Sequence, residues 1–192
     1  MSDAQASPHL PRRIIVGGTT GAGKTTAARR LSTMLGYPHI ELDALFWEAD
    51  WTPAAPEVFR ARVETATAAE AWVADGGYSM IRDLTWGRAD TFVWLDYSYP
   101  RVLRQLAGRT FGRIARNEQL WNGNRETVRN TFFSRDSLFV WQVKTLWDKR
   151  RRYPAALRSP AYSHLRVVRA RHPDALERWL RALERSMNAL PA

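Results

Sequence analysis

The sequence predicts an α/β fold in which a parallel sheet is flanked by helices. Short apolar runs alternate with longer segments of helical spacing, a glycine-rich loop joins the first run to the first helical segment, and no internal repeat interrupts the order. Such alternation requires crossover connections, which give parallel strands with helices on both faces.

The chain opens with a strand, a loop and a helix. Arg13–Gly17 is a β-branched run that ends at glycines, which is typical of a buried strand entering a tight turn. Apolar and small residues then recur at helical spacing from Lys24 to Leu35, and a Gly-x-Pro sequence ends this helix.

The alternation continues to the end of the chain. Further strands are expected at His39–Leu42, Trp72–Asp75, Thr91–Leu95 and Leu165–Val168, and helices at Pro56–Ala71, Pro100–Arg116 and Pro173–Leu190. Two polar stretches break the pattern, Asn117–Arg125 and Ser137–Tyr153. We interpret them as a cover over a site followed by a long helix.

Composition excludes several classes of protein. The 192 residues are 45% hydrophobic and 25% charged, which fits one domain, residues 1–192, with a sizeable core. The absence of cysteine excludes disulfides and thiolate metal sites. No apolar run approaches the roughly 20 residues of a membrane helix. We expect a cytoplasmic protein without a membrane partner, with a flexible lead-in over residues 1–11.

The net charge of +10 predicts an anionic partner, because a basic surface concentrates anions. Nucleotides and nucleic acid both qualify. The excess arginine is spread from Arg101 through Arg185, so a solvated basic surface on several helices is the alternative interpretation.

The segment Gly18–Thr25 satisfies the phosphate-loop pattern G-x-x-x-x-G-K-[ST] between a predicted strand and a predicted helix. Glycines let backbone amides turn toward phosphate oxygens, and the helix N-terminus adds its positive dipole end. Lys24 supplies charge to the β and γ phosphates and Thr25 a hydroxyl to Mg²⁺. The pattern predicts the P-loop NTPase fold with ATP and Mg²⁺ held by Gly18, Thr19, Thr20, Gly21, Ala22, Gly23, Lys24, Thr25 and Thr26.

Together with segments further along, this loop resembles the adenylate-kinase-like P-loop kinases, in particular a bacterial group labelled topology modulation proteins. The shared segments are Gly18–Thr25, Leu42–Trp47, Trp72–Tyr78, Arg82–Asp83, Arg88–Thr91, Trp94–Tyr97, Arg109–Thr110 and Leu120–Glu126. The resemblance implies a five-stranded parallel sheet in the order 2-3-1-4-5, ATP as donor, and a short arginine-rich lid over about residues 110–130.

The resemblance also implies roles for individual residues. Asp75 matches the carboxylate that holds Mg²⁺ through water, so Thr25 and Asp75 form the metal side, whereas Asp43 matches an aspartate that holds an acceptor hydroxyl. The implied catalytic residues are Lys24, Asp43, Asp75 and Arg109, with Arg109 and Arg113 gripping ATP from one helix face. The implied acceptor-side residues are Asp43, Trp47, Gly76, Tyr78, Arg82, Arg125 and Arg129.

The same residues admit structural interpretations, which stay open at this point. An aspartate at a strand end also starts turns, arginines four apart also form solvated helix faces, and the tryptophans also pack in a core. The segment from Asp43 to Pro56 holds no arginine or lysine for an acceptor phosphate, although Arg60, Arg62 or Arg82 could supply one. The acceptor is therefore left open.

Two functions of different classes follow. The first is a kinase that moves the γ-phosphoryl group of MgATP to a small acceptor without a covalent intermediate. The alternative is a nucleotide-dependent nucleic-acid-binding regulator, which the charge and the basic aromatic run Trp141–Tyr153 favour. A third, an ATPase that drives a partner, needs a residue to orient water, and the sequence identifies none.

Overall fold

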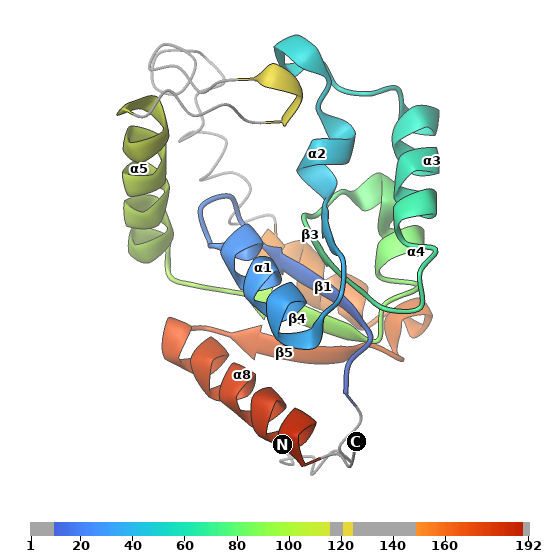
Figure 1. Ribbon diagram of the computed structural model, residues 1–192, viewed down its shortest axis with the longest axis vertical. Coiled ribbons are helices and arrows are strands. Elements are labelled where there is room, and N and C mark those ends of the chain that lie inside the picture. The colour runs from blue at the N-terminus through green and yellow to red at the C-terminus, as the bar shows by residue number, and fades with distance from the viewer. Residues whose placement is uncertain (1–9, 116–120, 125–148, 190–192) are drawn as a thin grey trace.

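The computed structural model describes residues 10–115, 121–124 and 149–189, in which five strands form one parallel sheet (Figure 1). The strands are β1 (Arg13–Gly18), β2 (His39–Glu41), β3 (Trp72–Asp75), β4 (Thr91–Leu95) and β5 (Arg166–Ala170). Their order is β2-β3-β1-β4-β5 and every pairing is parallel. The predicted fold class and strand order are confirmed.

Helices connect the strands. They are α1 (Lys24–Leu35), α2 (Leu42–Phe46), α3 (Pro56–Ala66), α4 (Arg82–Thr85), α5 (Tyr99–Ala115) and α8 (Pro173–Asn188), and residues 149–157 are also helical. Short 3₁₀ turns are η1 (Ala49–Trp51), η2 (Ser79–Ile81), η3 (Trp121–Gly123) and η4 (Pro160–Tyr162). Within the described ranges, no helix combines the length and apolar character needed to cross a bilayer.

Several predicted boundaries differ from the structure, among them that of the last strand, which was expected at Leu165–Val168 and lies at Arg166–Ala170. The helix expected over Pro56–Ala71 ends at Ala66, where the buried Thr67 hydroxyl donates to the Val63 carbonyl at 2.8 Å and closes the last turn. Leu42, expected in the second strand, instead begins α2. Elements as short as α2 and α4 leave no periodic pattern in a sequence, so they were not expected.

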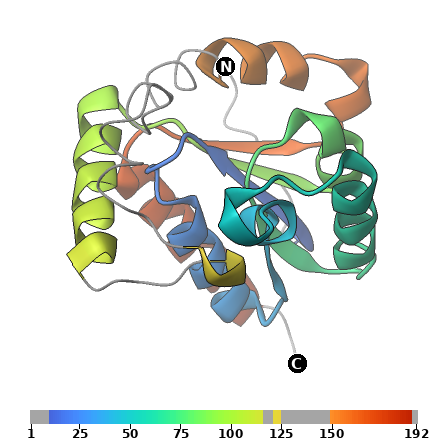
Figure 2. The same cartoon turned by 90° about the horizontal axis from the view of Figure 1, so that it is seen from above.

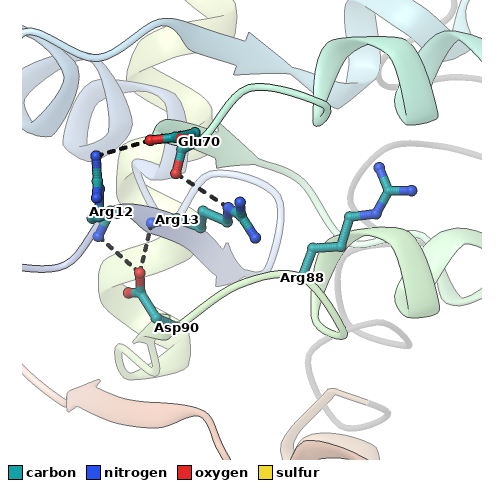
Figure 3. A pocket seen from close by; sticks show the side chains of 5 residues that line it. All are labelled: Arg12, Arg13, Glu70, Arg88 and Asp90. Carbon is teal, nitrogen blue, oxygen red and sulfur yellow. Dashed lines mark hydrogen bonds and ion pairs between the residues drawn. The ribbon is translucent and has the colours of Figure 1, made fainter.

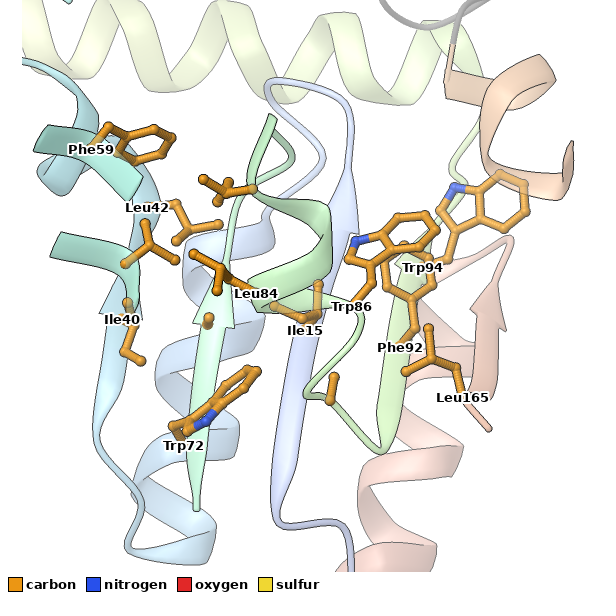
Figure 4. Close-up of a cluster of buried hydrophobic side chains, with 14 of the residues drawn as sticks. Ile15, Ile40, Leu42, Phe59, Trp72, Leu84, Trp86, Phe92, Trp94 and Leu165 are labelled. Atoms are coloured by element: carbon orange, nitrogen blue, oxygen red, sulfur yellow. The ribbon is translucent and has the colours of Figure 1, made fainter. Parts of the chain in front are cut away.

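The core lies in two layers, one on each face of the sheet. Side chains alternate along a strand, so Ile15 faces the layer under α3 and α4 while Ile14 and Val16 face α1 and α8. The α3/α4 layer is rich in aromatic rings, including the fully buried Trp72 and Phe59 (Figure 4). Burial of these apolar surfaces on both faces is the main force that stabilises the fold.

The carboxyl ends of the central strands meet at one edge of the sheet. In register, Val16 of β1 lies beside Asp75 of β3, and Glu41 of β2 lies beside Asp75 from the other side. Gly18, which ends β1, pairs with Leu95 of β4. The phosphate loop after β1, Asp75 at the end of β3 and Asp43 in the helix after β2 therefore lie where the strands end together, and parallel α/β sheets bind ligands at such a place.

A buried carboxylate fastens the helical residues 149–157 to this edge. Asp96, which follows β4 and is only 7% exposed, accepts hydrogen bonds from Arg150 Nε at 2.8 Å and from Arg169 Nη2 at 2.6 Å. The Arg169 guanidinium also lies 4.3 Å above the Trp94 ring. Three segments far apart in the sequence are joined at this one carboxylate.

Replacing Asp96 should therefore destabilise the protein. Asp96→Ala leaves two partly buried guanidinium groups without their carboxylate, and we expect the free energy of unfolding to fall by about 2–4 kcal/mol. Urea denaturation monitored by tryptophan fluorescence measures it, with Glu184→Gln on the exposed side of α8 as control. Equal midpoints for Asp96→Ala and the control would contradict the assignment.

Candidate active site

The phosphate loop leaves the N-terminus of α1 open. Gly21 has a φ of 79°, and a Cβ there would lie 2.8 Å from Leu106 Cβ, so α5 packs against the loop too closely for a side chain. Gly23, with a φ of 86°, precedes α1, and over the described part of the chain a Cβ built there would have no neighbouring atom within 4 Å. The first turn of α1 holds no acidic residue, and Gly23 brings no side-chain cap. The backbone N–H groups in the first turn of α1 can therefore bind an anion.

The remaining loop residues line the same turn. Thr19 and Ala22 are buried, Thr20 is half-buried, and Thr26 is exposed in the first turn of α1. The hydroxyl oxygen of Thr19 is buried and has no hydrogen-bond partner among the residues that the structure describes. A buried polar atom of this kind fits a site that a polar ligand completes.

The other predicted catalytic residues lie around the ammonium group of Lys24. Its Nζ donates to the Thr19 carbonyl at 3.1 Å. Burial lowers the pKa of Lys24, the carboxylates of Asp43 and Asp75 oppose this effect, and the positive charge of Arg109 adds to it. All four predicted catalytic residues thus lie within electrostatic reach of one another.

Thr25 and Asp75 form the predicted metal side. The Thr25 hydroxyl donates to Asp75 Oδ2 at 2.5 Å, and Asp75 is 5% exposed. His39 Nε2 lies 3.2 Å from Asp75 Oδ1, and because an ionised carboxylate only accepts, this nitrogen carries the proton. Hard oxygen groups placed side by side fit Mg²⁺, which usually keeps several waters and takes few protein ligands. Over residues 10–115, 121–124 and 149–189, no three His, Asp or Glu side chains gather as a metal site.

Asp43 is held from the acceptor side by a tyrosine. The Tyr78 hydroxyl donates to Asp43 Oδ1 at 2.6 Å, and the Tyr78 ring packs on Phe46 and Phe59. Burial raises the pKa of Tyr78, and the negative charge of Asp43 raises it further, so this hydroxyl stays protonated. Gly76 completes the arrangement: its φ is 137°, and a Cβ there would lie 2.8 Å from Leu42 Cβ.

The other predicted acceptor-side residues are placed as follows. The Arg82 guanidinium lies 4.6 Å above the Trp86 ring. Trp47 is half-buried, with its ring 4.9 Å from Phe46 and 5.7 Å from Trp51. Arg109 and Arg113 lie on α5, whereas Arg125, Arg129 and much of the predicted lid fall outside the described residues.

Two arginines near the acceptor side already form ion pairs. Arg60 pairs with Asp83, and Arg62 lies 2.8 Å from Glu48. Both arginines extend from α3 and already have carboxylate partners, so neither provides an uncommitted charge for an acceptor phosphate.

Lys149, which was not expected in the site, lies against the phosphate loop. Its Nζ donates to the Gly18 carbonyl at 2.8 Å, and a Cβ on Gly77 would lie 3.5 Å from it. Burial and then the charge of Lys24 lower the pKa of Lys149 to about 7, with Asp43 opposing. The only signal was its position in the basic aromatic run Trp141–Tyr153, which we used to support the nucleic-acid-binding alternative.

Lys149 should make stability depend on pH. On unfolding, its pKa returns to about 10.5, so between pH 7 and 10 the unfolded chain binds more protons and the folded state gains stability as pH rises. Relative to Lys149→Met, the parent should gain up to about 1 kcal/mol per pH unit between pH 7 and 9. Urea denaturation of both proteins at three pH values measures this difference in the free energy of unfolding. If the two proteins showed the same dependence on pH, folding would not lower the pKa of Lys149.

A hollow at the opposite end of the strands is lined by residues that bind one another (Figure 3). The lining residues are Arg12, Arg13, Glu70, Arg88 and Asp90. Asp90 Oδ2 accepts the backbone N–H groups of Arg12 and Arg13 at 2.8 Å each, and the Arg12 guanidinium pairs with Glu70. Arg13 begins β1, and Glu70 and Asp90 lie just before β3 and β4, so the hollow is at the amino ends of the strands. The hollow takes no part in the candidate site.

Comparison with known proteins places these features in a family. A family model described as Shikimate kinase matches residues 20–152, more than half of the chain. Shikimate kinase 2, chloroplastic, of Oryza sativa subsp. japonica is 28% identical over 111 residues, which is 50% of this chain and 36% of the relative. The protease ATPase subunit HslU of Campylobacter jejuni is 47% identical over 45 residues, and the chain spans 10% of its length.

Solved structures agree on the fold. A gluconokinase from Sinorhizobium meliloti 1021 is 20% identical with a TM-score of 0.52, covering 94% of this chain and 93% of its own. A shikimate kinase from Bacteroides thetaiotaomicron is 18% identical with a TM-score of 0.52, covering 91% and 99%. At this identity, the two structures support the P-loop fold and nothing narrower.

Proposed function

The chain belongs to the shikimate kinase family, and from this premise we propose that it is an ATP-dependent kinase with a small hydroxylated acceptor. The observation that carries the proposal is the grouping of Asp43, Asp75 and Arg109 around Lys24 at the phosphate loop. The nucleic-acid-binding alternative gains no support from the comparisons. The narrower resemblance to topology modulation proteins depends on sequence motifs alone and specifies no reaction.

The proposed mechanism uses positioning and charge. The loop amides and Lys24 hold the phosphates of ATP and stabilise the negative charge on the transferring group. Thr25 and Asp75 would hold Mg²⁺, which when bound neutralises charge on the β and γ phosphates. Asp43 uses Oδ1 for Tyr78, so Oδ2 is left to accept the acceptor hydroxyl and take its proton as the new O–P bond forms and the bond to ADP breaks.

Lys149 narrows the proposed acceptor to a hydroxy acid. Its ammonium is close enough to Asp43 for their charges to interact, whereas Arg60 and Arg62 already have carboxylate partners and the Arg82 guanidinium lies over the Trp86 ring. A carboxylate on the acceptor would pair with Lys149 while a hydroxyl reaches Asp43. A nucleoside monophosphate, whose phosphate usually meets several cations, is the weaker candidate.

The experiment is acceptor-dependent ADP formation. Purified protein is given MgATP with shikimate, gluconate, a panel of nucleoside monophosphates, or no acceptor, and ADP release is followed by a coupled assay. We expect one of the hydroxy acids to raise ADP formation well above the no-acceptor rate. Stimulation by nucleoside monophosphates alone would exclude the hydroxy-acid acceptor, and an acceptor-independent rate throughout would exclude the kinase.

A further inference from the structure

The segment Trp121–Asn124 binds the acceptor-side segment 41–51, although more than 70 residues separate them in the sequence (Figures 1 and 2). Trp121 Nε1 donates to Glu41 Oε2 at 2.8 Å. Asn122 Nδ2 donates to the Trp47 carbonyl. In Figure 2 the short yellow turn η3 lies against α2 and η1, in agreement with these bonds.

Asn124 makes the most specific of these contacts. Its side chain is 4% exposed and uses both polar atoms: Nδ2 donates to the Glu48 carbonyl at 2.8 Å, and Oδ1 accepts the Trp51 N–H at 2.9 Å. An asparagine amide alone among the uncharged side chains of this size offers a donor and an acceptor in one plane. Alanine would remove both of these hydrogen bonds to the main chain of segment 41–51.

The backbone at this junction is strained. Asp50, Trp51 and Asn122 have φ values of 56°, 54° and 52°, and they are the non-glycine residues with positive φ in the described ranges. Left-handed conformations are unfavourable for L-residues, above all for a bulky one such as Trp51, and persist where surrounding contacts enforce them. All three lie where segments 41–51 and 121–124 meet, so their contacts enforce the geometry.

Helix α2 needs such support. It has five residues, fewer than an isolated helix needs to be stable, yet its first turn carries Asp43. At one end Leu42 packs on Gly76, and at the other end the Trp47 N–H bonds back to the Asp43 carbonyl at 3.0 Å. The carbonyls of Trp47 and Glu48, just beyond that end, accept the two asparagine amides.

We propose that Trp121–Asn124 is a latch that fixes α2, and with it Asp43, in the position for phosphoryl transfer. Asn124 is then a positioning residue, and this role depends on the proposed kinase function. Trp121 ties the latch to the nucleotide side as well, because its partner Glu41 also accepts from Arg29 of α1 at 2.5 Å. The latch therefore connects the acceptor helix to the helix that follows the phosphate loop.

The first test is amide hydrogen exchange on the full chain. In Asn124→Ala we expect peptides covering residues 44–52 to exchange at least about tenfold faster, while α1 and β1 exchange as in the parent. Asn188→Ala, on the exposed end of α8, is the control and should match the parent. Unchanged exchange at 44–52 in Asn124→Ala would overturn the latch, whether or not any acceptor is found.

The second test separates positioning from general damage. With the acceptor identified in the panel, Asn124→Ala should lower kcat by about 10²-fold while the Kd for MgADP stays at the parent value, because a small misplacement of a reacting group is enough for such a loss. Equal kcat in parent and Asn124→Ala would refute the proposal. A parent without acceptor-dependent turnover would refute the proposed function instead, and the exchange result would still decide whether the latch holds α2.

Discussion

Lys24→Met is expected to lower phosphoryl transfer by about 10³-fold or more without unfolding the protein. The ammonium is the charge that the phosphate loop brings to the transferring group, and in a site shielded from water such a charge stabilises the transition state strongly. Methionine keeps the length of the side chain. Because burial disfavours the charged form of Lys24, removing the charge should leave the apo protein as stable as the parent or slightly more stable.

The measurement pairs turnover at saturating MgATP with thermal unfolding of the apo protein. Arg178→Met removes a positive charge from the exposed side of α8 and serves as the control for net charge. The control should keep parental turnover. If Lys24→Met retained near-normal turnover, or if the control lost as much, Lys24 would not be the residue that serves the transferred group.

Local signals were enough to predict where the phosphate loop lies in the fold. The phosphate loop is contiguous in the sequence, so its pattern names its own residues, and the strand on one side and the helix on the other are where the motif needs them. Asp43 and Asp75 were expected at strand ends, and parallel strands bring such ends together. The structure adds the partners: Tyr78 on one carboxylate, Thr25 on the other.

Contacts between residues far apart in the sequence could not be predicted. Lys149 reaches Gly18 because Arg150, the next residue, is fixed by Asp96, and no spacing in the sequence reports that pair. The same holds for Asn124, whose partners precede it by more than 70 residues. Contacts of this kind depend on how elements pack, and a single sequence carries no periodic trace of them.

The excess of arginine also proves partly structural. Arg30 pairs with Glu177, Arg88 with Glu64, and Arg169 with Asp96, so part of the positive charge joins elements of the fold. The solvent-exposed pairs each contribute little stability. The buried carboxylate of Asp96, in contrast, fixes the helical residues 149–157 in place through Arg150. A high net charge therefore gave a weaker indication of a partner than the phosphate loop did.

The two aspartates should respond differently to the same isosteric change. Asn at position 75 keeps an oxygen for the Thr25 hydroxyl but loses the negative charge beside it, so Asp75→Asn should raise the Mg²⁺ concentration at half-maximal turnover about tenfold or more. Asn at position 43 can still accept from Tyr78, but it cannot take a proton from an acceptor hydroxyl. Asp43→Asn should therefore lower kcat by about 10²–10³-fold while the Mg²⁺ titration stays parental.

Titrating Mg²⁺ at saturating ATP and acceptor, for parent and both variants, separates the two roles because each variant is the matched control for the other. A thermal unfolding curve for each protein excludes general damage, since both substitutions conserve shape and the hydrogen bonds from Thr25 and Tyr78. The charges of Asp43 and Asp75 both act on Lys24, so we expect both variants to lose turnover. A loss of turnover alone therefore does not distinguish the two roles. The decision rests on the midpoint of the Mg²⁺ curve. If Asp43→Asn shifted that midpoint as far as Asp75→Asn did, the division into an acceptor carboxylate and a metal-side carboxylate would be wrong.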